Sequence, residues 1–307
     1  MSKVFVAGSL NMDLTIQTGR VPGSGETVTG YGFITNPGGK GANQAAAAAR
    51  LGAEVEMIGA VGQDGFGREL IAALGGSGAH TGQIVRSPDF HTGVAMIIVS
   101  DGDNRIILDA GANGGVTGEQ LCHALGGAQP GDYLVTQLEI PLPAVLQAMQ
   151  AGRARGMHTV LNPAPAVELG EAFLSAAELF VPNEHECALL CGIMPEDEDS
   201  MLRAGRWFLE RGVGAVVITL GSRGAALVDK SGLWLCPSPR VRAVDSTAAG
   251  DCFIGAMVSA LARGEALRQA VWTGTRAGAL TVTRLGAQQS LPTRDELEAF
   301  IKGEGRG

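Results

Sequence analysis

The sequence predicts an α/β fold in which a central, mostly parallel β-sheet is flanked by helices and joined by a second, smaller β-sheet. Two observations support this prediction. Short apolar runs alternate with helical patterns of about 10 to 15 residues, which is typical of βαβ units. Two segments, residues 12–36 and 93–109, lack a helical period, and the second reads as a hairpin of two β-rich runs around Asp-Gly-Asp-Asn.

Length and composition fit one large domain over residues 1–307. The 45% hydrophobic content is enough for a sizeable core. The net charge of −8 argues against a nucleic-acid or anionic-membrane partner, because either requires a basic face. No apolar stretch reaches about 18 residues, and the N-terminus has no signal-peptide pattern. We therefore expect a cytoplasmic protein.

The elements of the main sheet follow one another along the chain. The apolar run at 3–9 predicts the first strand, and the alanine-rich stretch 41–52 predicts the first helix. The alternation continues through strand 54–62, a helix from about Gly65 to Leu74, strand 132–137, helix 141–156, strands 158–165 and 178–183, helices 183–192 and 198–212, and strand 215–224. Residues 248–284 are helical in pattern and divide into two helices, of which the first is rich in small residues that allow close packing.

The two β-rich segments are expected to form a lid. A small sheet beside the ends of a parallel sheet is placed to close over a ligand, so we assign the lid to residues 12–36 and 93–109. Its exposed edges would also pair with a second copy of the chain, which predicts a homodimer formed through the lid.

The five cysteines predict reduced thiols. Their number is odd and their spacing forms no disulfide framework. Cys187 and Cys191, with His185 nearby, resemble half of a zinc site, but no second ligand pair follows. Buried small hydrophobic side chains are the better interpretation.

Polar residues follow several of the predicted strands. The carboxyl ends of parallel strands are where ligands bind in open α/β sheets. Each of these residues would also serve as a turn former or a helix cap, but their convergence favours one polar site. They are Asn11 and Asp13 after strand 3–9, Glu139 after 132–137, Asn183 at the end of 178–183, and Thr219 with Gly221 in 215–224.

The segment NPGGKGANQ (36–44) is a second cluster. Its glycines allow a ligand to approach the backbone, and Lys40 and Asn43 offer donors to hydroxyl groups. It is not a Walker A loop, because Gly41 follows Lys40 where Ser or Thr is required, and the chain has no G-x-G-x-x-G after a strand. A plain glycine turn before a helix is the alternative.

The segment DSTAAGDCFIGA (245–256) combines an anion site with a carboxylate. If residues 248–251 open a helix, their free N–H groups and the helix dipole stabilise negative charge on a transferring phosphoryl group. Asp251 then accepts the proton of the attacking hydroxyl. The alternative is that Asp251 only caps the helix.

These two segments resemble the signatures of the ribokinase family of carbohydrate kinases. DSTAAGDCFIGA resembles the C-terminal signature and NPGGKGANQA the N-terminal one, and the likeness extends over essentially the whole chain. The resemblance implies a ribokinase-like fold and an ATP-dependent kinase that phosphorylates the 5-hydroxyl of D-ribose to give ribose 5-phosphate and ADP. It also implies Mg²⁺ with ATP and K⁺ as a monovalent activator.

The resemblance assigns roles residue by residue. Asp251 matches the catalytic base, and the anion hole falls on Ala248, Ala249 and Gly250. The sugar-facing positions are Asn11, Asp13, Gly39, Lys40, Gly41, Asn43 and Glu139. The nucleotide-facing positions are Asn183, Glu186, Thr219, Gly221, Ser222, Gly224, Gly250 and Thr275. The ligands of the monovalent cation, several of them through backbone carbonyls, fall on Asp245, Thr247, Thr281, Arg284, Gly286 and Ser290.

The sequence departs from the family pattern at a few positions. Ser246 and Cys252 stand where threonine is common, and both are conservative in size. Gly274 and Thr275 stand where the family often has an Asn or His facing the adenine, so the contact to the base must differ.

Two other functions compete with ribose phosphorylation. The first keeps the chemistry but uses deoxyribose, a keto-sugar acid or a nucleoside, although no aromatic residue stands beside Asn11, Lys40 or Glu139 to favour a nucleoside. The second is a sugar-binding regulator without catalysis, which would be expected to have lost Asp251 or the anion hole.

Overall fold

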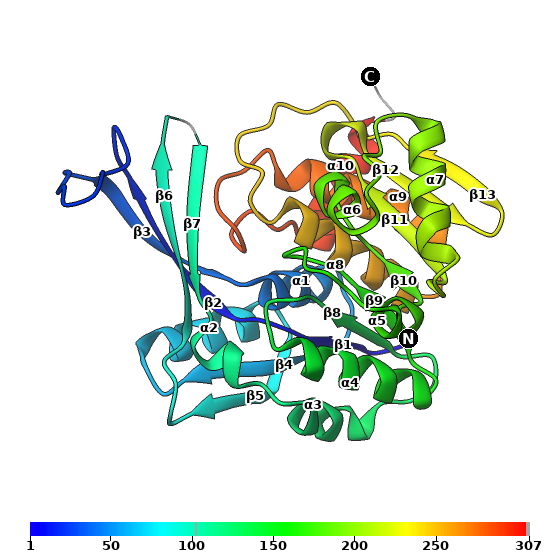
Figure 1. Ribbon diagram of the computed structural model, residues 1–307, viewed down its shortest axis with the longest axis horizontal. Coiled ribbons are helices and arrows are strands. Elements are labelled where there is room, and N and C mark those ends of the chain that lie inside the picture. The colour runs from blue at the N-terminus through cyan, green and yellow to red at the C-terminus, as the bar shows by residue number, and fades with distance from the viewer. Residues whose placement is uncertain (102, 305–307) are drawn as a thin grey trace.

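The larger of two β-sheets runs through the middle of the molecule (Figure 1). The computed structural model describes residues 1–101 and 103–304, and this sheet has nine strands in the order β13-β12-β11-β10-β9-β8-β1-β4-β5. From β11 to β5 neighbouring strands are parallel, whereas β12 and β13 are antiparallel at one edge. The strands are β1 (Val4–Ala7), β4 (Val55–Gly62), β5 (His80–Ser87), β8 (Tyr133–Thr136), β9 (His158–Leu161), β10 (Leu179–Phe180), β11 (Ala215–Thr219), β12 (Ala225–Asp229) and β13 (Gly232–Cys236). The predicted α/β class is confirmed.

Helices cover both faces of this sheet. Successive side chains of a strand point to opposite faces, so Val4 and Val6 of β1 join one hydrophobic core, and Phe5 and Ala7 join the other. The first core is covered by α1 (Lys40–Arg50), α2 (Gly65–Gly76), α8 (Ala249–Ala262), α9 (Leu267–Thr281) and α10 (Arg294–Glu304). The second is covered by α3 (Gly118–Ala124), α4 (Leu142–Ala154), α5 (Glu171–Ala176), α6 (Glu184–Cys191) and α7 (Glu198–Leu209). Within the described residues, no helix combines the length and the apolar character that crossing a membrane requires.

Several predicted boundaries moved for local reasons. The run 158–165 ends as a strand at Leu161, because Pro163 and Pro165 have no N–H to donate to a neighbouring strand. The run 215–224 ends at Thr219, because Gly221–Arg223 form a 3₁₀ turn before the chain returns as β12. The antiparallel hairpin of β12 and β13, strand β5, and helices α3, α5 and α10 had no clear signal in the sequence.

The second sheet has four strands and projects from one side of the body (Figure 1). Its strands are β2 (Asn11–Gln17), β3 (Tyr31–Gly38), β6 (Gly93–Ser100) and β7 (Asp103–Asp109), in the order β3-β2-β6-β7. The predicted hairpin is present as β6 and β7, although Gly102 in its turn lies outside the described residues. The sheet begins at Asn11, so Asn11 and Asp13 belong to this sheet and not to a turn after β1.

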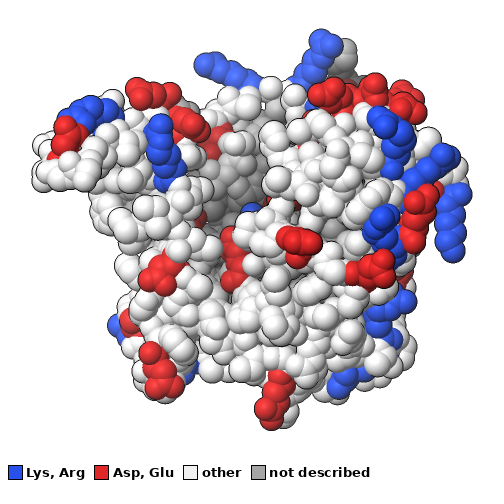
Figure 2. Space-filling model, viewed as in Figure 1, with Lys and Arg blue, Asp and Glu red and all other residues white. Residues whose placement is uncertain are grey.

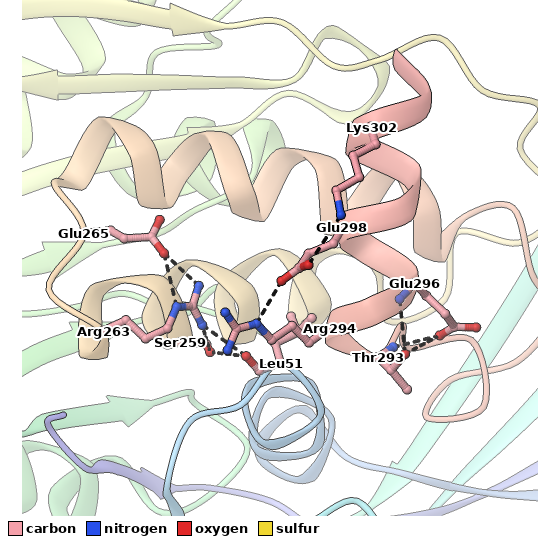
Figure 3. Close-up of polar contacts among 9 residues, drawn as sticks. All are labelled: Leu51, Ser259, Arg263, Glu265, Thr293, Arg294, Glu296, Glu298 and Lys302. Carbon is pink, nitrogen blue, oxygen red and sulfur yellow. Dashed lines mark hydrogen bonds and ion pairs between the residues drawn. The ribbon is translucent and has the colours of Figure 1, made fainter. Parts of the chain in front are cut away.

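Helices α1 and α8 pack closely and are joined at their C-terminal ends (Figure 3). The Oγ of Ser259 on α8 donates to the carbonyl of Leu51 at the end of α1, at 3.1 Å. Arg263 donates to the same carbonyl at 3.1 Å and is held in turn by Glu265. Because α1 and α8 begin at the candidate site, this contact holds the helices in register from the far end.

Candidate active site

The candidate site begins where the strand order of the main sheet reverses. The chain adds β4 on one side of β1 and later adds β8 on the other, and ligands of open α/β sheets bind at such a point. Glu139, just after β8, accepts a 2.6 Å hydrogen bond from Ser9 Oγ and a 3.4 Å bond from Asn11 Nδ2. It also accepts from the backbone N–H of Lys40 at 3.3 Å. Glu139 therefore ties the segment after β1 to the start of α1.

Asn113 fixes the orientation of the Asn11 amide. It is buried in the short 3₁₀ helix Gly111–Gly115, and it both accepts from the Leu10 N–H and donates to the Leu10 carbonyl. Its Nδ2 also donates to Asn11 Oδ1 at 2.8 Å, which leaves the Asn11 amide nitrogen facing Glu139. Sequence reasoning missed Asn113, because it lies in a glycine-rich segment without a helix or strand period.

The glycines of the 36–44 segment permit a close approach of backbones. Gly39 has φ +91°, a left-handed conformation that favours glycine, and a Cβ there would lie 2.6 Å from the Asn11 backbone nitrogen. A Cβ on Gly41 would lie 2.7 Å from the Gly8 carbonyl carbon and the Ser9 nitrogen. The glycines thus seat the N-terminus of α1 directly against the segment after β1, which places Lys40 and Asn43 in the site.

Asp251 lies in the first turn of α8 and bonds to α1. Its Oδ2 accepts from Asn43 Nδ2 and its Oδ1 from Gln44 Nε2, both at 3.0 Å. The helix has no side-chain cap, so Asp251 is not the capping residue that the alternative interpretation required. The residue before the helix, Ala248, has φ +59°, an unusual and costly value for a residue with a Cβ.

A cavity of about 220 Å³ opens at this turn of α8. Among the described residues, the N–H groups of Gly250 and Asp251 have no intramolecular acceptor. The cavity is lined by Lys40, Asn162, Ala164, Val181, Asn183, Glu186, Thr219, Ser246, Ala248, Ala249, Gly250, Asp251 and Ile254. The structure therefore brings the proposed anion hole, base, lysine and part of the nucleotide set together. Figure 2 shows a hollow between the projecting sheet and the body, with acidic side chains in it.

Lys40 carries the positive charge among the carboxylates of this site. Burial alone would lower the pKa of Lys40, but Asp251, Glu139, Glu186 and Asp13 act together and raise this pKa above its usual value. Burial raises the pKa of Glu186, although a backbone hydrogen bond from Asn183 and the charge of Lys40 both oppose the shift. The site thus has a lysine that stays protonated and an excess of acidic groups, which suits a cationic partner.

Asp13 has the strongest shift among the acidic groups of the site. Burial, and then the charges of Glu139 and Asp251, raise the pKa of Asp13 to about 7, with Lys40 opposing them. The carboxyl therefore binds a proton on folding between its ordinary pKa and about 7. Because the folded state holds this proton and the unfolded state does not, the stability of the protein falls as the pH rises through this window.

Replacing Asp13 with asparagine removes this pH dependence. Without sugar, we expect the melting temperature of the wild type to fall more between pH 5 and pH 8 than that of Asp13→Asn, measured by thermal unfolding. Asp103→Asn, an exposed carboxylate in the same sheet, serves as the control and should follow the wild type. Equal pH slopes for Asp13→Asn and the wild type would contradict a raised pKa.

The nucleotide-facing positions are only partly brought together. Asn183 and Glu186 form a capping box on α6, with the Glu186 N–H donating to Asn183 Oδ1 at 2.8 Å. Thr219 lies beside Asn183 through a β-bridge. Gly221, Ser222 and Gly224 follow in the turn after β11 but do not line the cavity. Thr275 is buried in α9 and donates to the Val271 carbonyl, so its hydroxyl is occupied within the helix.

The residues assigned to the monovalent cation lie in two loops joined by Asp245. Its Oδ1 accepts from the N–H and hydroxyl of Thr247, and its Oδ2 accepts from the Gly286 N–H at 2.9 Å. Thr281 and Ser290 are buried, with hydroxyls bonded to the carbonyls of Ala277 and Ala287. The Arg284 guanidinium pairs with Glu296, so it is only the backbone of Arg284 that suits a cation.

The cysteines are free thiols, as expected. Cys187 and Cys191 are adjacent on α6, and the described residues contain no group of three side chains able to hold a metal with them. Cys252 is fully buried against Thr281, and burial raises the pKa of its thiol to about 12. Cys252 therefore acts as a small core residue beside Asp251.

Comparisons with known proteins agree with this geometry. A model of the pfkB family of carbohydrate kinases matches residues 1–294. A ribokinase from Schizosaccharomyces pombe is 40% identical, over 97% of this chain and 97% of its own. A deoxyribokinase from Salmonella typhi is 33% identical, over 97% of this chain and 98% of its own. The structure of Arabidopsis thaliana ribokinase complexed with ribose and ATP superimposes with a TM-score of 0.90 at 29% identity, over 98% of this chain and 99% of that one.

Proposed function

The chain belongs to the pfkB family of carbohydrate kinases, and we propose that it transfers the γ-phosphoryl group of ATP to the 5-hydroxyl of D-ribose, giving ribose 5-phosphate and ADP. It is a phosphotransferase with an alcohol group as acceptor. The observation that carries the proposal is the position of Asp251, which lies between the free amides of α8 and the buried Lys40. The ribokinase relatives, one of them solved with ribose and ATP, support ribose as the sugar.

The proposed chemistry uses the first turn of α8 for two tasks. Asp251 accepts the proton of the sugar hydroxyl as its oxygen attacks the γ-phosphorus. The free N–H groups of Gly250 and Asp251, at the positive end of the helix dipole, stabilise the negative charge that develops on the phosphoryl oxygens. Lys40 adds a protonated amine to the same cavity. The left-handed Ala248 and its neighbour Ala249 shape the turn that presents these amides.

The sugar is proposed to bind between β2 and α1. Asn11, Asp13 and Glu139 offer carboxylate and amide groups from one side, and Asn43 and Lys40 from the other. Gly39 and Gly41 bring the two sides close enough for one sugar to contact both. The small sheet that carries Asn11 and Asp13 is proposed to act as the lid over the sugar.

The residues present fit a magnesium ion that enters with ATP. One Glu186 oxygen is taken by the capping box, and the other is left in a cavity whose burial raises the pKa of this carboxyl, a cost that a bound cation removes. Glu186 and Asn183 would hold the hydrated ion. When bound, Mg²⁺ neutralises charge on the phosphates of the nucleotide.

A potassium ion fits the two loops joined by Asp245. The side-chain groups of Asp245, Thr247, Thr281 and Ser290 are occupied by hydrogen bonds, so the ion would bind mainly to carbonyl oxygens, as the family resemblance implies. This site lies just before α8, which gives a bound cation a route to order the turn at Ala248.

Deoxyribose is the second candidate substrate, because the Salmonella typhi deoxyribokinase is 33% identical over nearly the whole chain. The deciding experiment is ADP release by the purified protein with Mg²⁺-ATP, across pentoses, deoxyribose, fructose, keto-sugar acids and nucleosides, each with and without K⁺. We expect turnover with ribose that K⁺ stimulates. Turnover with another sugar alone would replace the substrate, and sugar binding without any turnover would indicate a non-catalytic regulator.

The small sheet is proposed to form a homodimer. Exposed apolar side chains gather on it, at Tyr31, Phe33, Ile34, Met96, Ile106, Ile107 and Leu108. An exposed apolar area of this kind usually marks an interface. Ile106 and Ile107 are 61% and 66% exposed and, as neighbours in a strand, point to opposite faces of the sheet. The cytoplasm, where ATP is available, remains the compartment we propose.

Charging both faces of the small sheet should separate the dimer. We expect the wild type to sediment at twice the 31.5 kDa chain mass and the double variant Ile106→Glu/Ile107→Glu to sediment as one chain. Leu189→Glu, which places the same charge on an exposed apolar position of α6, should remain a dimer. A wild type that sediments as a single chain would refute the proposal.

A further inference from the structure

Gln44 is a buried amide directly behind the proposed base. It follows Asn43 on α1 and is 1% exposed. Its Nε2 donates one proton to Asp251 Oδ1 at 3.0 Å and the other to Asn162 Oδ1 at 3.2 Å. Its Oε1 accepts from Gln137 Nε2 at 2.6 Å. Both protons of the Gln44 amide and its oxygen are therefore engaged by side chains from α8 and from the segments that follow β8 and β9.

The neighbours of Gln44 determine which way its amide points. Asn162 donates through Nδ2 to the Val181 carbonyl at 2.9 Å, so the atom that it turns toward Gln44 is an acceptor. Gln137 turns its donor toward Gln44, so the Gln44 oxygen must face it. With its oxygen and one proton committed, Gln44 has one remaining proton, and it points at Asp251. A rotated amide would place a carbonyl oxygen against a carboxylate, which costs the bond and adds repulsion.

We infer that Gln44 is a positioning residue for phosphoryl transfer: it holds the Asp251 carboxylate by Oδ1 so that Oδ2 faces the sugar hydroxyl. This inference rests on the proposed function, in which Asp251 is the base. Asn43 Nδ2 lies on the Oδ2 side at 3.0 Å, and the family resemblance places Asn43 at the sugar. The two oxygens of Asp251 thus have different environments, one facing the buried amide chain and the other the sugar side.

The charged groups around Asp251 do not substitute for this contact. Lys40 from α1, Asp13 from β2 and Glu186 from α6 interact with Asp251 through their charges, and Cys252 follows it on α8. Among the described residues, none of these four side chains hydrogen-bonds to either Asp251 oxygen. Removing the Gln44 donor therefore leaves Oδ1 without a partner in a buried place, and the carboxylate both loses its orientation and binds a proton more readily.

The test compares Gln44→Met, which keeps the shape without the donor, with Gln44→Glu, which replaces the donor by an acceptor. We expect Gln44→Met to lower kcat about 10- to 100-fold with the sugar KM within about threefold, since the base acts in the transition state. The acidic limb of its kcat profile should move to higher pH. Gln44→Glu should move that limb further, because two adjacent carboxylates share one proton.

Ser259→Ala serves as the matched control, since it removes a fully buried hydrogen-bonding side chain of α8 at the end away from the site. It should lower the melting temperature without moving the pH profile. If Gln44→Met does not fold, Asn162→Ala removes the group that orients Gln44 without touching Asp251, and it should lower kcat in the same sense by a smaller factor.

The possible results separate the positioning role of Gln44 from the proposed function. A wild-type pH profile in Gln44→Met, or a loss confined to KM, would overturn the positioning role while the wild-type turnover with ribose upholds the proposed function. A wild type without turnover on any sugar would overturn both. Loss of kcat with a displaced acidic limb would establish Gln44 as the group that sets the orientation of the base.

Discussion

Asp251→Asn is expected to lower kcat by a factor of about 10² to 10⁴, the usual contribution of a positioned general base, while leaving the sugar bound. The substitution changes one oxygen to an amide nitrogen and keeps the shape of the side chain. Because the base is needed when the hydroxyl attacks and not when the sugar docks, the loss should fall on kcat. Steady-state ADP release and calorimetric titration with ribose measure the two effects separately.

The surroundings of Asp251 add a second expectation for this variant. Asn43 and Gln44 both donate to it, and an asparagine has only one acceptor oxygen, so one donor would face an amide group. We expect a stability loss of about 1 to 3 kcal/mol, measured by denaturant unfolding. Glu298→Gln, the same chemical change at a half-exposed position of α10, is the control and should keep wild-type kinetics. Turnover near the wild-type rate in Asp251→Asn would exclude Asp251 as the base.

Gly255→Ala is expected to damage both stability and turnover, although the residue touches no substrate. A Cβ there would lie 2.6 Å from the Cβ of Ala47 and 2.7 Å from the backbone oxygen of Gln44, so α1 and α8 must separate. Overpacking of this kind costs about 1 to 3 kcal/mol. These two helices carry Asn43 and Asp251 at their N-termini, and a displacement of about 1 Å between reacting groups can lower a rate about 10²-fold.

Gly75→Ala is the matched control for Gly255→Ala. Gly75 lies in α2, and no atom is within 4 Å of the place that its Cβ would take. Alanine at that position should leave kcat unchanged and, through its better helix propensity, raise stability by up to about 1 kcal/mol. If Gly255→Ala behaved like Gly75→Ala in both denaturant unfolding and ADP release, the close contact of α1 and α8 would not be needed for the site.

Much of the fold followed from local patterns. The strand at Val4–Ala7, the alanine-rich helix Lys40–Arg50 and the hairpin of β6 and β7 were predictable, because periodicity and turn residues act over a few neighbours. The edge hairpin of β12 and β13 was not, because edge strands are short and half exposed, and their pairing depends on the neighbour that they meet. Nor did the sequence show that β2 would pair in parallel with β6, some 80 residues along the chain.

The site divides in the same way. The sequence by itself determined the chemistry at hand: a carboxylate at a helix start, a lysine among glycines, and polar residues after parallel strands. Only the tertiary structure decided which of them meet, as when it placed Asn113 on Asn11 from 102 positions away and Gln44 on Asp251 from 207. The physical reason is range. Helix capping and strand alternation act between near neighbours, whereas the burial and hydrogen-bond partners that orient a carboxylate are set by segments distant in sequence that packing brings together.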